Sequence, residues 1–251
     1  MIILKHYIKR AFLDPIGVLV FVLMPIIFIT VMYLLNMDIE GYYHIVNGYN
    51  TVSTGNVIAN MLVFQFMGGT YIIDYVYLDF KSDRRWRLLS AQSLNKYLLY
   101  ALAACVMFSM VSSLIVLGVG YFFLNAYVGN IIMILAVVLC VALFGQLLGI
   151  FLSLFVKKKS TCEGILMASV WIMFILSGFM FGIEIPVFGG FMQDYGTPAA
   201  VAIHAIFQSG LPALGVSEPD MNRAYLSLAI LVGFTAAIAV AVFVAGRRKP
   251  L

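Results

Sequence analysis

Residues 131–156, IIMILAVVLCVALFGQLLGIFLSLFV, contain no charged side chain and are followed directly by Lys157, Lys158 and Lys159. An α-helix needs about 20 predominantly apolar residues to cross the hydrocarbon core of a bilayer. The stretch shows no alternation of apolar and polar residues with a period of two, so it fits a helix better than a barrel strand. We therefore predict that this segment crosses a membrane as a helix.

The rest of the chain has the composition of a membrane protein. Of its 251 residues, 63% are hydrophobic and 10% are charged, whereas a soluble domain is about half apolar and about a quarter charged. Pro25 lies inside the first apolar segment and is expected to bend it. We predict an all-α membrane protein with six transmembrane helices in one domain, residues 1–251. The other five predicted spans are residues 16–35, 57–78, 97–124, 164–183 and 224–245.

Basic residues mark one side of this membrane domain. Of the 15 Lys and Arg residues, all except Arg223 precede the first span, follow the sixth, or lie in the connections after the second and fourth spans. The positive-inside rule assigns such segments to the cytoplasm. We therefore expect both termini in the cytoplasm and the chain in a bacterial plasma (inner) membrane, in contact with its lipid bilayer.

Two segments outside the spans have an unusual apolar pattern. In residues 1–14, apolar residues alternate at helical spacing with Lys5, Lys9 and Arg10, which predicts a cytoplasmic interfacial helix. A plain basic flank that only fixes topology is the alternative. Residues 199–207 are apolar except for His204 but are too short to span a membrane. We predict an outer re-entrant helical hairpin within residues 184–223.

The sequence lacks the side-chain groupings that most enzymes need. None of the three histidines is spaced to form a metal site with another His, a Cys or a carboxylate. No glycine-rich loop with a lysine is present to hold a phosphate. We therefore expect no catalytic residue, metal ligand or cofactor in this chain. Asp74, the one acid well inside a span, is expected to reach the interface or to pair with a cytoplasmic arginine.

A charged stretch follows the second span. Residues 79–87, DFKSDRRWR, include six charged side chains. The three lysines at 157–159 indicate that far less charge is enough to fix topology. The surplus charge, the mixed signs and Trp86 therefore favour docking on another protein, and a solvated topology signal is the alternative.

Two stretches carry a resemblance to a known family. Residues 85–102, RWRLLSAQSLNKYLLYAL, are similar to a charged helix that leads through paired leucines into a third span. Residues 177–201, SGFMFGIEIPVFGGFMQDYGTPAAV, are similar to the end of a fifth span with its two prolines. With the order of segments, they make nearly the whole chain resemble the permease subunits of ABC type-2 exporters. The chain departs from the family at Asp83-Arg84, where Gly-Thr is frequent, and at Gln92, where proline is usual.

The resemblance implies a coupling helix within residues 79–96 that docks on a separate ATPase subunit. ATP and Mg²⁺ would bind to that partner, and two permeases, identical or homologous, would combine with two ATPases. No nucleic-acid partner is expected. The residues expected in the coupling contact are Asp79, Lys81, Asp83, Arg84, Arg85, Trp86 and Arg87.

The resemblance also implies that the second and fifth spans line a pathway between two permeases. Aromatic and Met side chains at helical spacing would form an adaptable apolar surface there. Such a surface favours an amphipathic substrate, namely a drug, an antimicrobial peptide or a lipid-linked molecule. Packing against neighbouring helices is the alternative for any one of these residues. The candidate pathway residues are Asn60, Phe64, Gln65, Met67, Tyr71, Met167, Trp171, Phe174, Gly178 and Phe181.

These observations predict the non-catalytic transmembrane subunit of an ATP-driven exporter. A stand-alone secondary transporter or channel is the main alternative, but it would need acids or broken helices near the middle of the membrane, and the sequence offers few of either. A membrane-embedded enzyme is less favoured because its catalytic groups are missing.

Overall fold

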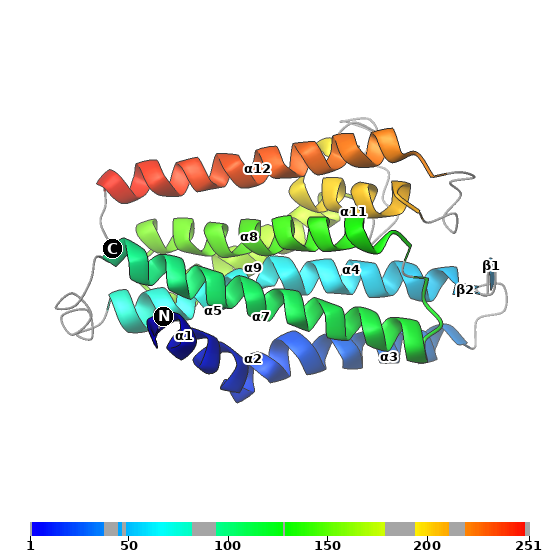
Figure 1. The fold of residues 1–251 in the computed structure, drawn as a ribbon, viewed down its shortest axis with the longest axis horizontal. Helices are drawn as coiled ribbons and strands as arrows, with labels where there is room; N and C mark the ends of the chain where they lie inside the picture. The colour runs from blue at the N-terminus through cyan, green and yellow to red at the C-terminus, as the bar shows by residue number, and fades with distance from the viewer. Residues whose placement is uncertain are drawn as a thin grey trace.

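Long helices lie side by side along one axis in the computed structural model of the chain (Figure 1). The structure describes residues 2–37, 45–46, 49–81, 94–127, 129–178, 194–210 and 219–248. Helix α1 and the last turns of α12 lie toward the same end of the bundle, which we call the terminal end. The short strands β1 and β2 lie at the opposite end.

The described residues form helices almost throughout. Their one sheet is a two-residue antiparallel ladder in which Ile45 pairs with Asn50 and Val46 pairs with Tyr49. The elements are α1 Ile2–Leu13, α2 Pro15–Val18, the π-helix η1 Leu19–Leu23, α3 Met24–Met37, β1 Ile45–Val46, β2 Tyr49–Asn50, α4 Thr51–Met67, α5 Gly69–Tyr75, the π-helix η2 Val76–Phe80, α7 Leu94–Phe123, α8 Ile131–Phe155, α9 Lys159–Leu176, α11 Pro198–Gln208 and α12 Met221–Arg248.

Six helical stretches in the described residues are long and apolar enough to cross a membrane, as predicted. They are Pro15–Leu34, Thr54–Asp79, Leu98–Phe123, Ile131–Phe155, Lys159–Leu176 and Met221–Arg247, numbered here as spans 1 to 6. Span 5 begins five residues earlier than predicted, at 159 instead of 164, because its first turn is polar and hydropathy does not mark it. The end predicted for it, residues 179–183, lies outside the described residues.

Span 1 contains a π-helical turn beside Pro25, and the bend predicted there stays a prediction. The π-helix Leu19–Leu23 lies just before this proline. Since Pro25 has no N–H, the carbonyl of Phe21, four residues earlier, loses its α-helical donor. The hydroxyl of Ser112 in α7 donates to that carbonyl instead. A neighbouring span thus satisfies the backbone group that the proline leaves without a partner, which an apolar environment requires.

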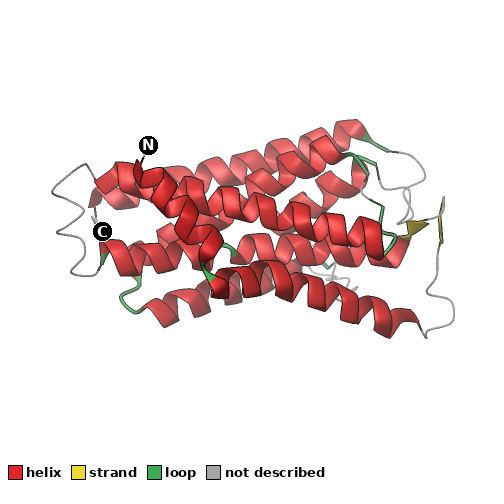
Figure 2. Ribbon diagram, turned by 60° about the horizontal axis from the view of Figure 1, so that its bottom comes forward, coloured by secondary structure: helices red, strands yellow, loops and turns green. Residues whose placement is uncertain are grey.

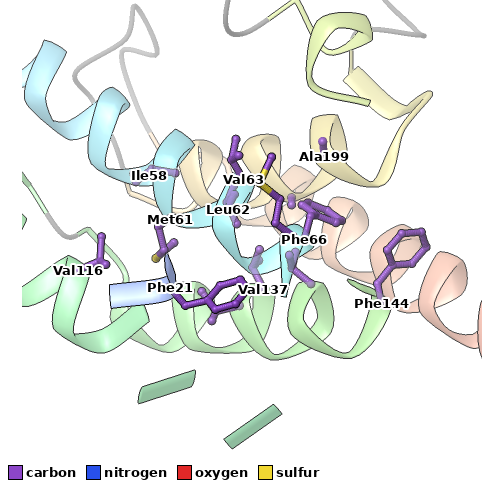
Figure 3. Close-up of a cluster of buried hydrophobic side chains, with 14 of the residues drawn as sticks. Phe21, Ile58, Met61, Leu62, Val63, Phe66, Val116, Val137, Phe144 and Ala199 are labelled. Carbon is purple, nitrogen blue, oxygen red and sulfur yellow. The ribbon is translucent and has the colours of Figure 1, made fainter. Parts of the chain in front are cut away.

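Span 2 lies in the middle of the bundle and is mostly buried inside the chain. Its first part, α4, contacts α3, α7, α8, α9 and α11. The ring of Phe66 packs edge-on against Phe144 of α8 and Phe174 of α9, with ring centroids 5.8 Å apart in both pairs. Figure 3 shows Phe66 among buried side chains from several of these helices. Few residues of spans 1, 5 and 6 are buried inside the chain, so these spans form the outside of the bundle.

Glycines bring span 2 against α8 at backbone distance. A Cβ added to Gly69 would overlap the carbonyl oxygen of Gly145, and one added to Gly149 would overlap the carbonyl oxygen of Gly69. A Cβ on Gly145 would lie 2.7 Å from the carbonyl oxygen of Phe66. Small residues allow such close approach of helices in membranes, where packing rather than the hydrophobic effect holds them together.

The two predicted non-spanning segments contain helices. Helix α1, Ile2–Leu13, turns away from the direction of α3 (Figures 1 and 2). Asp14 follows it and accepts a hydrogen bond of 3.2 Å from the N–H of Ile16. Helix α11, Pro198–Gln208, is buried against α8, α9 and α12. The interfacial position of α1 and the re-entrant character of residues 184–223 stay predictions, and 179–193 and 211–218 lie outside the described residues.

Candidate functional site

The terminal end of span 2 carries polar side chains that reach three other elements of the bundle. We call these residues, Asp74, Tyr77, Asp79 and Lys81, the span-2 terminus. They lie in α5, in η2 and directly after η2. Asp79 and Lys81 are also the first two charged residues of the stretch 79–87 predicted to dock on a partner. The π-helix η2 adds a wide turn here, and such turns are frequent at functional sites.

Asp79 binds the N-terminal helix. Its Oδ2 lies 2.7 Å from the Nη1 of Arg10 in α1, and Asp79 is buried. The guanidinium of Arg10 also lies over the ring of Tyr75, 4.3 Å from the ring centroid. A charge-assisted hydrogen bond between partly buried groups is stronger than one between neutral groups. The pair therefore fastens α1 to the end of span 2.

A second contact joins α1 to span 2, about two turns before Asp79. The hydroxyl of Tyr71 donates to the carbonyl oxygen of Ala11 at 2.9 Å and lies 3.1 Å from the carboxylate of Asp14. The ring of Tyr71 stacks on Phe108 of α7, with centroids 5.3 Å apart. This residue, predicted to line a pathway, thus contacts the chain's own helices.

Lys81 and Tyr77 cap the end of α8. The hydroxyl of Tyr77 donates to the carbonyl oxygen of Val156 at 2.6 Å, and the Nζ of Lys81 donates to the same oxygen at 2.9 Å. Lys81 also donates to the carbonyl oxygen of Ser153. The last four carbonyls of a helix have no partner within it, so these donors satisfy groups that α8 cannot. Partial desolvation in this position lowers the pKa of Lys81 from its ordinary value, although the residue as a whole is exposed.

Asp74 binds the start of α9. Its carboxylate forms an ion pair with Lys159, whose Nζ also lies 3.6 Å from Glu163. We expected Asp74 to reach the interface or pair with an arginine, but its partner is this lysine. Lys159 follows the turn after α8, and the turn is therefore held to span 2 on both sides, through Lys81 and through Asp74.

We predict an energetic coupling between Arg10 and Asp79. Arg10→Gln and Asp79→Asn should each lower the free energy of unfolding by about 1–3 kcal/mol, because each leaves a partly buried group without its charged partner. The double variant should lose less than the sum, by about 1 kcal/mol. The measurement is thermal unfolding of the four proteins in nanodiscs. Lys9→Gln, which removes an exposed charge from the next position, serves as the control; strictly additive losses would contradict the coupling.

Among the predicted coupling residues, the structure describes two. Asp79 and Lys81 make the contacts above within the chain. The other five, Asp83, Arg84, Arg85, Trp86 and Arg87, lie outside the described residues. Contact with a partner stays a prediction for all seven.

The candidate pathway residues do not share one surface. Within the bundle, the structure buries Asn60, Gln65, Met67, Tyr71 and Phe174. Phe64, Met167 and Gly178 are half-buried, Trp171 is 40% exposed, and Phe181 lies outside the described residues. Their role in a pathway stays a prediction.

Sequence reasoning missed the partners of the span-2 terminus. From the sequence, Arg10 is predicted to lie on the basic face of an interfacial helix and Lys159 to be a topology signal, and nothing is predicted for Tyr77. Their contacts join residues 69 to 85 positions apart, for which a single sequence gives no pairing signal. The one local signal was the acid Asp74 inside a span, which needs a nearby cation.

Comparisons with known proteins find no family model and no curated protein that matches the chain. In the part of the chain that the structure describes, no three His, Cys, Asp or Glu side chains cluster as metal ligands would. The fold and the span-2 terminus therefore carry the functional argument.

Proposed function

We propose that the chain is the permease subunit of an ABC exporter of type 2. The observation that carries the proposal is the fastening of the span-2 terminus to α1, α8 and α9, at the point where the charged stretch 79–87 begins. A force applied to that stretch would move one end of span 2 and, through these contacts, three other elements together. In an ATP-driven transporter, the segment that binds the ATPase subunit must pass its movement to several transmembrane helices at once.

The proposed orientation has the terminal end in the cytoplasm of a bacterium, with the protein in the plasma membrane. Support comes from the basic residues, since Lys5, Lys9, Lys157, Lys158 and Arg247 all lie near that end of the helices. Cytoplasmic ATP would then be available to the partner that docks on residues 79–96.

The proposed assembly has two permeases and two ATPase subunits, which bind ATP and Mg²⁺. The docking contact would combine the positive charges of Arg84, Arg85 and Arg87 with acids on the ATPase, and Trp86 would provide an aromatic anchor. Because the partner supplies the hydrolysis, this chain is proposed to be non-catalytic.

The proposed substrate is amphipathic, namely a drug, a peptide or a lipid-linked molecule. Trp171, with Phe64 and Met167 less exposed, offers aromatic and Met surface on α4 and α9, two helices in contact. Such side chains adapt to varied apolar shapes.

Affinity purification of the tagged chain from its native membrane tests the proposal. We expect a P-loop ATPase to co-purify, and we expect the complex to hydrolyse ATP at a rate that responds to amphipathic compounds. The isolated chain should hydrolyse none. ATP hydrolysis by the contaminant-free chain, or substrate movement that needs no ATPase, would contradict the assignment.

A further inference from the structure

A cluster of polar side chains lies buried in the middle of the bundle, away from the span-2 terminus. It consists of Gln65 in α4, Ser109 and Ser113 in α7, and Gln146 in α8, and we call it the polar core. All four side chains are at least nine-tenths buried. These side chains lie between spans 2, 3 and 4. Because they are buried there, bulk solvent cannot supply their hydrogen bonds.

Two amides of the polar core converge on one residue. The Nε2 of Gln65 donates to the backbone carbonyl oxygen of Ser109 at 2.8 Å and also to the hydroxyl of Ser113. The Nε2 of Gln146 faces the hydroxyl of Ser109 at 3.5 Å, which is long for a hydrogen bond of this type. Gln65 is thus firmly held through its nitrogen, and Gln146 only weakly.

The oxygen of each amide has no donor. Both Gln65 Oε1 and Gln146 Oε1 are buried and have no hydrogen-bond partner among the residues that the structure describes. Rotating the Gln65 amide would bring its oxygen against the carbonyl oxygen of Ser109, so its orientation is fixed. Rotating the Gln146 amide would place its oxygen near the Ser109 hydroxyl and its nitrogen where the oxygen now lies. The group without a partner would then be the N–H donor instead of the oxygen acceptor. Either way, two buried amide groups need a further partner.

The backbone of span 2 is interrupted beside this cluster. Helix α4 ends at Met67 and α5 begins at Gly69. The N–H of Gly68, between them, is shared between the carbonyls of Phe64 and Gln65, at 3.0 and 3.1 Å. A Cβ at Gly68 would lie 3.2 Å from both Gln146 Nε2 and Ser109 Oγ. The polar core therefore faces a glycine at the junction of two helix segments.

We propose that the polar core is an internal hydration site that holds a water molecule between Gln65 and Gln146. A water can donate to both amide oxygens and accept from a serine hydroxyl, which matches the groups present. Buried waters in proteins typically make about three hydrogen bonds to groups that would otherwise be unpaired. This proposal does not depend on the transport function.

The proposal predicts the sign of a substitution effect. Methionine has nearly the size and shape of glutamine but no amide. If a water joins the two side chains, Gln146→Met removes one of its partners and leaves Gln65 Oε1 poorly satisfied, so Tm should fall by about 4 °C. If the oxygens have no common partner, the same substitution removes a buried unpaired acceptor, and Tm should stay or rise.

A double-mutant cycle in nanodiscs keeps the test independent of packing changes. Under the proposal, the effects of Gln65→Met and Gln146→Met on Tm are not additive. The Tm of the double variant should be at least 2 °C higher than the value obtained by adding the two single shifts, which corresponds to an interaction free energy of about 1 kcal/mol. Additive shifts would overturn the proposal. Ser227→Ala is the matched control, because Ser227 Oγ in α12 is also buried and has no hydrogen-bond partner in the described part of the chain. This substitution should leave Tm unchanged or raise it.

A density map that resolves both amides gives the direct answer. We expect a peak within hydrogen-bond distance of Gln65 Oε1 and Gln146 Oε1 in the unmodified protein, and its loss in Gln146→Met. A map of that quality with no such peak, or with the two amides bonded directly to each other, would refute the hydration site.

Discussion

Gly69→Ala is expected to abolish the close packing of span 2 on α8 and to lower the free energy of unfolding by about 3 kcal/mol or more. The added methyl group would overlap the carbonyl oxygen of Gly145. That oxygen belongs to the backbone of a long helix, so no side-chain rotation can make room for the methyl. The two helices must move apart, and the contacts of Phe66 with Phe144 would be lost with them.

Thermal unfolding in detergent, followed by size-exclusion chromatography, measures the effect. Gly118→Ala is the control, because a Cβ at Gly118 meets no atom within 4 Å. Alanine is also the better helix former, by about 1 kcal/mol in soluble hosts. The control should therefore melt as the unmodified protein does or higher. Equal behaviour of the two variants would show that the Gly69 contact is not needed for packing.

Reversing Arg84, Arg85 and Arg87 together to Glu is expected to prevent ATPase binding or to separate ATP hydrolysis from transport. The change removes three positive charges from the proposed docking surface and adds three negative ones. A close charge pair that is desolvated at an interface is worth roughly 2–5 kcal/mol when one partner is lost, and far less at the rim. A loop in free solvent would tolerate the change.

Co-purification of the ATPase and the export rate are the two measurements. Because the substitutions weaken the positive-inside signal, orientation must be measured in the same variant, by labelling Lys158→Cys from each side of the membrane. The matched control is Lys157→Glu, which reverses an exposed charge near the same end of the bundle. A correctly oriented triple variant that still binds the ATPase and exports normally would leave this run as a topology signal.

The sequence predicted the spans well because their signal is local. A run of apolar residues such as 131–156 marks its own helix, and the structure places α8 at Ile131–Phe155. Pro25 is also a local signal, because its missing N–H removes one α-helical hydrogen bond wherever the proline lies inside a helix. What could not be foreseen was that Ser112, in another span, would satisfy the carbonyl of Phe21.

The faces of the helices were harder to predict than their limits. Aromatic and Met side chains occur both in a membrane protein's core and on its substrate surface, so the pattern in span 2 fitted either. The structure puts Tyr71 inside the bundle and leaves Trp171 exposed. The difference depends on which helices surround span 2, and spacing along the chain does not contain that information.

The contacts of the span-2 terminus give the growing polypeptide an order of assembly during its synthesis. Asp79 can bind Arg10 as soon as span 2 is made, since that partner comes 69 residues earlier. Lys81 must wait for the carbonyl of Ser153, 72 residues later, and Asp74 must wait for Lys159. The most apolar 18 residues of span 2 have a mean hydropathy of 1.3, against 2.9 for those of span 4. Because of the order of these partners in the chain, span 2 could form its contact with α1 when it enters the bilayer. Its contacts with α8 and α9 could form only after the fourth and fifth spans are inserted beside it.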